Sequence, residues 1–172
     1  MHDIIITEVK NNTLNIYIAG EIKRSKTLKV KVGIKNLNNL LIIGAVNASS
    51  DTTISTNKLD VFISGISKLK FNVFTPEFNC EITDAGLAYI QGDADVFDLR
   101  VTDEGEIDAF NLNARKASLK VSGYSISRIN VQEELSMRVT GAANVYYQGE
   151  PEITRRVFSG TGFIIRRKNE SE

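Results

Sequence analysis

The sequence of 172 residues has few of the residues that many function classes require. A single cysteine, Cys80, cannot form an internal disulfide, so no disulfide framework is expected. A single histidine, His2, excludes His-centred catalytic triads and multi-histidine metal sites. No apolar run reaches 18 residues, so the sequence predicts no membrane span. Basic and acidic side chains are equal in number, 21 each, which gives no support for nucleic-acid binding.

β-branched and turn-forming residues are abundant instead. The chain holds 20 Ile, 13 Val and 12 Thr, together with 15 Asn and 13 Ser. The first group favours pleated strands and the second favours turns. Apolar residues alternate with polar ones over short segments such as 14–18 and 28–32, and no segment shows a helical period over three turns. The sequence therefore predicts an all-β protein.

Glycine-containing turns recur along the chain at a nearly constant interval. From Ser64 onward the first residues of successive turns are separated by 20, 19, 19, 18 and 19 residues. Glycine allows tight corners because it tolerates positive φ. The glycines predicted to form these structural turns are Gly44, Gly65, Gly86, Gly105, Gly123, Gly141, Gly160 and Gly162.

A short strand with the same pattern precedes each turn. Its first and third residues are apolar, so they point inward, while the middle residue points to solvent. Repetition stacks these strands in parallel and aligns their residues in columns. The first inward column is predicted to contain Val61, Cys80, Leu99, Leu119 and Met137, and the second Ile63, Ile82, Val101, Val121 and Val139.

The predicted fold is a right-handed parallel β-helix, a solenoid of roughly six coils of about 19 residues, like the pectin lyases. The irregular coil length disfavours a left-handed helix of hexapeptides, and the calcium-binding nonapeptide of β-rolls is absent. We expect residues 1–172 to form one solenoid domain. Within it, residues 1–40 would be irregular opening coils or a cap, residues 41–166 the repeat region, and residues 167–172 a charged tail.

The chain also resembles the putative auto-transporter adhesin, head GIN domain family. The turns at this spacing carry the resemblance, as does a closing motif in which Tyr147, Gly149 and Pro151 precede the Gly160 and Gly162 turn. The resemblance covers about residues 8–166 and implies a right-handed parallel β-helix with an adhesive role at the cell envelope or cell surface. Several glycines of the family pattern are replaced here, for example by Ala85 and Glu104.

The first residues show no charged n-region, apolar h-region or cleavage site of an export signal. The sequence leaves open whether the chain is a trimmed piece of a longer protein or a shortened paralogue.

Asp84 and Asp103 are the metal candidates in the sequence. They occupy neighbouring turns, and Ca²⁺ binds carboxylate and carbonyl oxygens. The more frequent role of Asp in such turns is to bond the backbone. We therefore expect no cofactor and no metal, with calcium at Asp84 and Asp103 as the alternative.

Paired carboxylates offer a route to polysaccharide cleavage, which many parallel β-helices perform. Asp84 with Asp103, or Asp93 with Asp95, could supply two carboxyl groups about 5 Å apart. Ten acidic residues lie between Glu77 and Asp108 and only Arg100 opposes them, so the basic partner common in such enzymes is nearly missing. The sequence thus predicts no catalytic residue.

Aromatic residues are the remaining candidates for ligand contact. Phe71, Phe74 and Phe78 fall within one coil, and Tyr146 and Tyr147 point to opposite strand faces. The predicted function is non-enzymatic binding or adhesion at the cell envelope, with a surface glycan or protein as ligand and self-association as an option. A structural envelope module and a polysaccharide enzyme are the alternatives.

Overall fold

A computed structural model describes residues 5–20 and 28–168, which contain strands and no helix. Within these ranges nothing helical is long and apolar enough to cross a membrane. The chain divides into two compact units, Met1–Ile34 and Lys35–Glu172.

The first unit contains a β-hairpin. Strands β1 (Ile5–Lys10) and β2 (Thr13–Ile18) pair in antiparallel register. The two connecting residues, Asn11 and Asn12, have φ of 48° and 60°. Asparagine tolerates this left-handed conformation, which matches the twist of a two-residue hairpin turn. Whether residues 1–40 serve as opening coils or as a cap stays a prediction.

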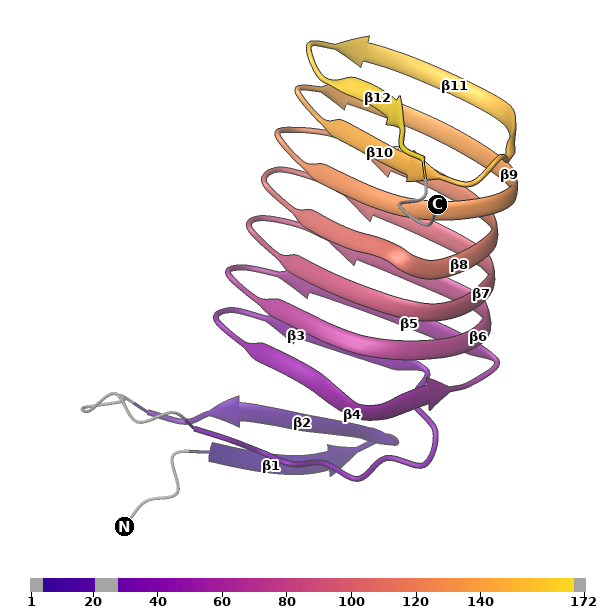
Figure 1. Ribbon diagram of the computed structural model, residues 1–172. Helices are drawn as coiled ribbons and strands as arrows, with labels where there is room; N and C mark the ends of the chain where they lie inside the picture. The colour runs from indigo at the N-terminus through magenta and orange to yellow at the C-terminus, as the bar shows by residue number, and fades with distance from the viewer. Residues whose placement is uncertain (1–4, 21–27, 169–172) are drawn as a thin grey trace. The chain divides into compact units, whose positions relative to one another are not determined.

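The second unit is a parallel β-solenoid whose coils wind in a right-handed sense (Figure 1). Its strands pair in parallel throughout the described residues. The strands are β3 (Asn39–Ile43), β4 (Asn47–Ser55), β5 (Lys58–Ser64), β6 (Lys68–Ile82), β7 (Leu87–Val101), β8 (Glu106–Val121), β9 (Ile126–Gly141), β10 (Asn144–Gln148), β11 (Glu152–Gly160) and β12 (Phe163–Arg166).

Each coil has two straight sides joined by two different corners. At the first, which we call the turn corner, the chain leaves its strand for a few residues, as between Ile82 and Leu87. At the second, the bend corner, strands β6 to β9 continue around the corner without ending, and shifts of pairing register accommodate the change of direction.

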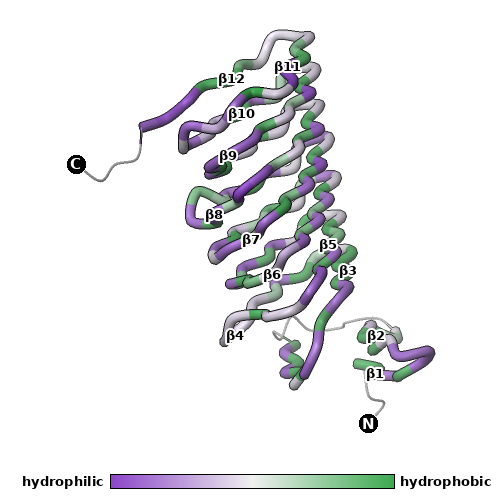
Figure 2. The backbone as a smooth tube through the Cα atoms, turned by 90° about the vertical axis from the view of Figure 1, so that its right-hand side faces the viewer, coloured by the Kyte–Doolittle hydropathy of each residue, from purple (hydrophilic) through white to green (hydrophobic). Residues whose placement is uncertain are grey.

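Both predicted inward columns are confirmed. Val61 pairs with Cys80, and the ladder continues through Leu99 and Leu119 to Met137. The second column is equally continuous, from Ile63 through Ile82, Val101 and Val121 to Val139. Hydrophobic and hydrophilic residues alternate along much of strands β6 to β9 (Figure 2), because neighbouring side chains point to opposite faces.

In the described part of the chain the stack has seven coils, compared with the roughly six predicted. The first column begins at Leu40 in β3 and ends at Arg156 in β11. Arg156 stands where the other coils have an apolar side chain, just after a shift of the pairing register between Ile153 and Arg155. Arg156 remains exposed in this last described coil. The solenoid and its coil length are confirmed, while the closer likeness to pectin lyases stays a prediction.

Cys80 lies within the core and is 2% exposed. Burial raises the pKa of its thiol to about 12, because the apolar surroundings penalise the thiolate. We expect a thiol reagent at pH 8 to modify the folded protein much more slowly than protein unfolded in guanidinium. Equal rates in the two states would contradict this burial.

Ser127 places a hydroxyl in an otherwise apolar inward column, between Ile107 and Val145. The side chain is fully buried, and its Oγ has no hydrogen-bond partner among the described residues. An unsatisfied buried hydroxyl is costly. The Ser127→Ala variant should therefore unfold at higher urea concentration, with a gain of about 1 kcal/mol.

Ser125 supplies a matched control, since it is equally buried but its Oγ donates to the Ser122 carbonyl at 2.8 Å. Ser125→Ala should destabilise the protein by about 1 kcal/mol. If both substitutions shift the urea midpoint in the same direction, the assignment of Ser127 as unsatisfied is wrong.

Candidate functional site

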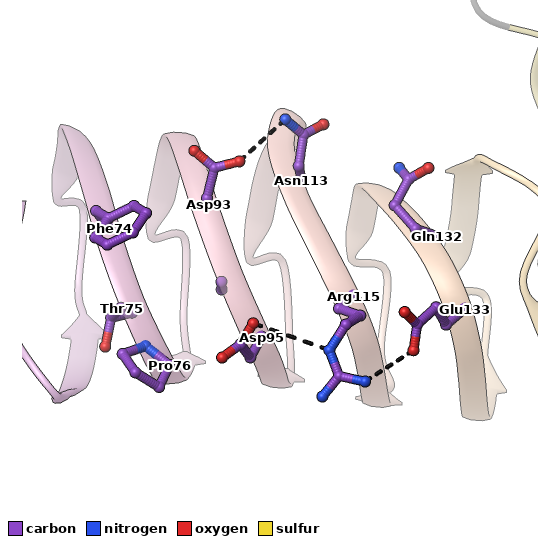
Figure 3. Close-up of a pocket in the computed structure, with 10 residues that line it drawn as sticks. Phe74, Thr75, Pro76, Asp93, Asp95, Asn113, Arg115, Gln132 and Glu133 are labelled. Carbon is purple, nitrogen blue, oxygen red and sulfur yellow. Dashed lines mark hydrogen bonds and ion pairs between the residues drawn. The ribbon is translucent and has the colours of Figure 1, made fainter.

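A groove runs across the bend corner of four adjacent coils. Its volume is about 360 Å³. Each coil contributes side chains from the same part of its strand, so the lining forms two rows along the solenoid axis (Figure 3). The residues that line it are Phe74, Thr75, Pro76, Asp93, Ala94, Asp95, Asn113, Arg115, Gln132 and Glu133.

The first row is a chain of hydrogen-bonded polar side chains. Asn113 Nδ2 donates to Asp93 Oδ1 at 3.3 Å. Asn130 Nδ2 donates to Asn113 Oδ1 at 3.0 Å, and Gln132 Nε2 donates to Asn130 Oδ1 at 2.7 Å. The bonds connect three neighbouring coils, the last step running through the buried Asn130 to Gln132 on the same strand, and they fix the orientation of the amides.

The second row is a chain of ion pairs centred on Arg115. Its guanidinium lies 2.8 Å from Glu133 and 3.9 Å from Asp95. The hydrogen bond to Glu133 is the main reason that the pKa of Arg115 is raised above its usual value, and the charges of Glu133 and Asp95 add to it. Arg115 is thereby held between the two neighbouring coils.

Phe74 closes one end of the groove. Its side chain is 62% exposed, whereas Phe71 and Phe78 of the same coil are buried and pack edge-to-face at 5.9 Å. Thus the aromatic cluster of the sequence separates into a core pair and one surface ring. Pro76 follows on the same coil and adds a rigid apolar surface (Figure 3).

Asp84 and Asp103 lie at the turn corner, away from this groove. They have φ of 56° and 59°, the conformation that Gly65 and Gly123 adopt in the adjacent coils. Aspartate is one of the few side chains that tolerate this region. These residues therefore take the place of glycine in a stack of left-handed positions.

The Asp84 carboxylate reaches back to the preceding coil. Its Oδ2 accepts hydrogen bonds from Ser64 Oγ at 2.6 Å and from the Gly65 amide at 3.0 Å. Asp103 accepts a bond from Thr102 Oγ1 at 2.9 Å. In the described residues no group of three or more His, Cys, Asp or Glu side chains is placed to hold a metal ion. The predicted absence of a metal, and calcium at Asp84 and Asp103 as its alternative, are not tested by this arrangement.

Asp84 should contribute a pH-dependent part of the stability. The bond from Ser64, followed by that from Gly65, lowers the pKa of Asp84 below the usual 3.8. Its contribution is therefore present above the unfolded-state pKa and is lost as the pH falls through the lowered folded-state value. Asn also tolerates a left-handed turn, so Asp84→Asn removes the charge without disturbing the backbone.

We expect the melting temperature of the wild type to exceed that of Asp84→Asn by a constant amount from roughly pH 7 to pH 5 and by less below about pH 4. A difference that persists unchanged to roughly pH 2 would show that the carboxylate charge plays no part.

The closing motif joins the last two coils at the bend corner. Tyr147 packs against the core and pairs with Ile129 and Arg166. Arg166 Nε donates to the carbonyl oxygen of Gly149 at 2.9 Å, and its guanidinium contacts Glu150. Pro151 is half-buried directly before β11. The motif thus makes contacts within the chain across the last two coils.

The two carboxylate pairs considered for catalysis lie at different corners, and the members of each pair stay at the same corner. Asp93 and Asp95 line the bend groove, whereas Asp84 and Asp103 form turns. Sequence reasoning did not single out Asn113, Arg115, Gln132 and Glu133, which complete the groove. One signal was available: polar residues recur there at the coil period, 20 residues from Asp93 to Asn113 and 19 more to Gln132.

The acidic stretch from Glu77 to Asp108 does not form one charged face. Its members lie on both sides of the coil and at both corners, and several pair with cations of adjacent coils. Glu77 contacts Lys58, and Glu106 contacts Arg128. A cluster in sequence is therefore spread around the solenoid.

The turns, the closing motif and the stacked coils together agree with one family of proteins. The family model described as "Putative auto-transporter adhesin, head GIN domain" matches residues 1–151. The chain belongs to this family. The matched head GIN domain region includes Tyr147, Gly149 and Pro151, but not the turn of Gly160 and Gly162.

Solved structures have the same fold. A putative adhesin from Bacteroides fragilis NCTC 9343 is similar with a TM-score of 0.85 and 22% identity, over 96% of this chain and 77% of that one. A putative adhesin from Parabacteroides distasonis ATCC 8503 gives 0.76 and 24%, over 95% and 79%. A putative lipid binding protein from the same organism gives 0.79 and 22%, over 95% and 79%. A search of curated proteins found no match.

Proposed function

We propose that this head GIN domain chain is a non-enzymatic binding module that acts in adhesion at the cell envelope. The observation that carries the proposal is the bend groove, in which oriented polar side chains recur from coil to coil beside one exposed ring. Family membership supports an adhesive role, and the described part of the chain offers a rigid stack on which such a surface is displayed.

The arrangement of charges in the groove supports binding over catalysis. A glycosidase needs one protonated carboxyl as general acid beside a second, ionised one. Asp95 and Glu133 both pair with the Arg115 guanidinium, so two of the three carboxylates that line the groove are engaged with a cation. The groove therefore suits polar recognition better than acid catalysis.

Adhesion can be tested on cells of the organism that carries the gene, with and without a deletion. Adhesion to immobilised glycans and matrix proteins should fall in the deletion strain and return on complementation. Phospholipid vesicles belong in the same panel, because one structural neighbour is described as a lipid binding protein. Unchanged adhesion, or binding to vesicles alone, would contradict the proposal and favour a structural or lipid-binding role.

The purified chain should also release no reducing ends from the same glycans. Hydrolysis that is lost in Asp93→Asn or Asp95→Asn would make the protein an enzyme.

A further inference from the structure

We infer that the bend groove binds a linear glycan without acidic groups, lying along the solenoid axis. This inference rests on the proposed binding function and identifies the chemistry of its ligand. Its support comes from the length of the groove, its charge and the kinds of side chain that line it.

The length of the groove matches a short oligosaccharide. Its lining residues come from four adjacent coils, the first carrying Phe74 and the last carrying Glu133. Adjacent strands lie about 4.8 Å apart, so the lining extends about 14 Å along the axis. A single sugar unit of an extended polysaccharide is close in length to the spacing of adjacent coils, so roughly three sugars would fit along the groove.

The charge of the groove selects against polyanions. Asp93, Asp95 and Glu133 supply three carboxylates and Arg115 one guanidinium, an excess of two negative charges. Like charges brought together at a binding surface cost free energy. An acidic polysaccharide or a nucleic acid should therefore be repelled, whereas neutral and amino-sugar glycans are not.

The polar row offers the paired donors and acceptors that sugar hydroxyls require. A hydroxyl group both donates and accepts, so it can bridge a carboxylate and an amide. Asp93 and Asn113 are exposed and are already oriented by the bond between them. Because these side chains are already oriented before binding, they lose less conformational freedom when a ligand binds along the row.

Phe74 completes the site at one end. An exposed aromatic ring presents a flat apolar face with partial negative charge, and the C–H groups on the face of a pyranose ring pack against such a surface. Among the residues that the structure describes, Phe74 is the one aromatic side chain that lines the groove. Phe74 therefore determines where the glycan is placed along the axis.

The test is isothermal titration of the purified chain with tetrasaccharides: cellotetraose, chitotetraose and tetragalacturonate. We expect at least one of the two neutral tetramers to bind at millimolar concentration or tighter and tetragalacturonate to bind at least tenfold more weakly. Phe74→Ala and Asn113→Ala should each weaken the binding about tenfold or more.

The control variant is Tyr124→Ala, which removes an exposed ring, 77% accessible, from the turn corner. It should leave the affinity unchanged. Thermal melts of all three variants establish that each is folded, since Phe74 and Tyr124 lie at the surface.

No binding of either neutral tetramer would overturn the inference. So would equal or tighter binding of the acidic tetramer, or binding that both groove variants retain. If adhesion of cells still depends on the gene in that case, the proposed function stands and only the ligand assignment fails.

Discussion

Replacing Phe97 by alanine should lower the free energy of unfolding by about 3–5 kcal/mol. Phe97 is 1% exposed and stacks on Phe78, with ring centroids 5.1 Å apart and an interplanar angle of 6°. The two rings belong to adjacent coils and pair directly in the ladder of β6 and β7. Alanine would remove this contact and leave a cavity between coils that are held in place by their backbone ladders.

Urea denaturation followed by far-UV circular dichroism measures this effect as a lower midpoint. Phe74→Ala is the matched control, because it removes the same ring from an exposed site and should change the free energy of unfolding by no more than about 0.5 kcal/mol. A loss of stability as large in Phe74→Ala as in Phe97→Ala would contradict the described core.

Gly149→Ala should be the second strongly destabilising change, by about 2–6 kcal/mol. Gly149 has φ of +89°, and a Cβ there would lie 1.9 Å from the carbonyl oxygen of Val131. The neighbour is backbone in the preceding coil, so a side-chain rotation cannot relieve the clash. Both the positive φ and the overlap penalise the substitution.

Gly44→Ala separates these two effects. Gly44 has a similar φ of +100°, but a Cβ there meets no described atom within 4 Å. This variant should lose only about 1–2 kcal/mol, the cost of a left-handed alanine. Equal urea midpoints for the two variants would contradict the claim that Gly149 must be glycine because the coils approach closely there.

The repeat was predictable because it combines two independent periodicities. Side chains alternate along each strand and turns recur at the coil length, so the spacing alone aligns Cys80 with Leu99, its observed partner in the ladder. The turn corner carries glycine, serine or aspartate, which give it a visible sequence signal. These signals define the columns residue by residue.

The bend corner has no such signal in every coil, although single residues such as Pro76 and Gly149 lie there. Strands β6 to β9 pass through it without ending, so no glycine or proline pattern common to the coils marks it. In the sequence Asp93 and Asp95 are distinguished only by their acidity, and Asn113 and Arg115 belong to none of the usual motifs. The groove arises from side chains that the three-dimensional stack brings together, each one coil from the next.

The irregular pairing of the last coil could likewise not be predicted from the sequence. Arg155 and Arg156 interrupt the alternation of β11, and the register shift that accommodates them depends on pairing with β9. A local sequence pattern carries no information about such a shift, because it is defined only relative to the partner strand.

The central claim is that this head GIN domain chain acts at the cell surface. The most direct measurement is to treat intact cells of the organism that carries the gene with a protease that cannot enter them, and to follow the native gene product by immunoblot. Its cleavage on intact cells, with an internal marker protein left whole, is the result we predict. Full protection on intact cells, with cleavage only after lysis, would contradict adhesion.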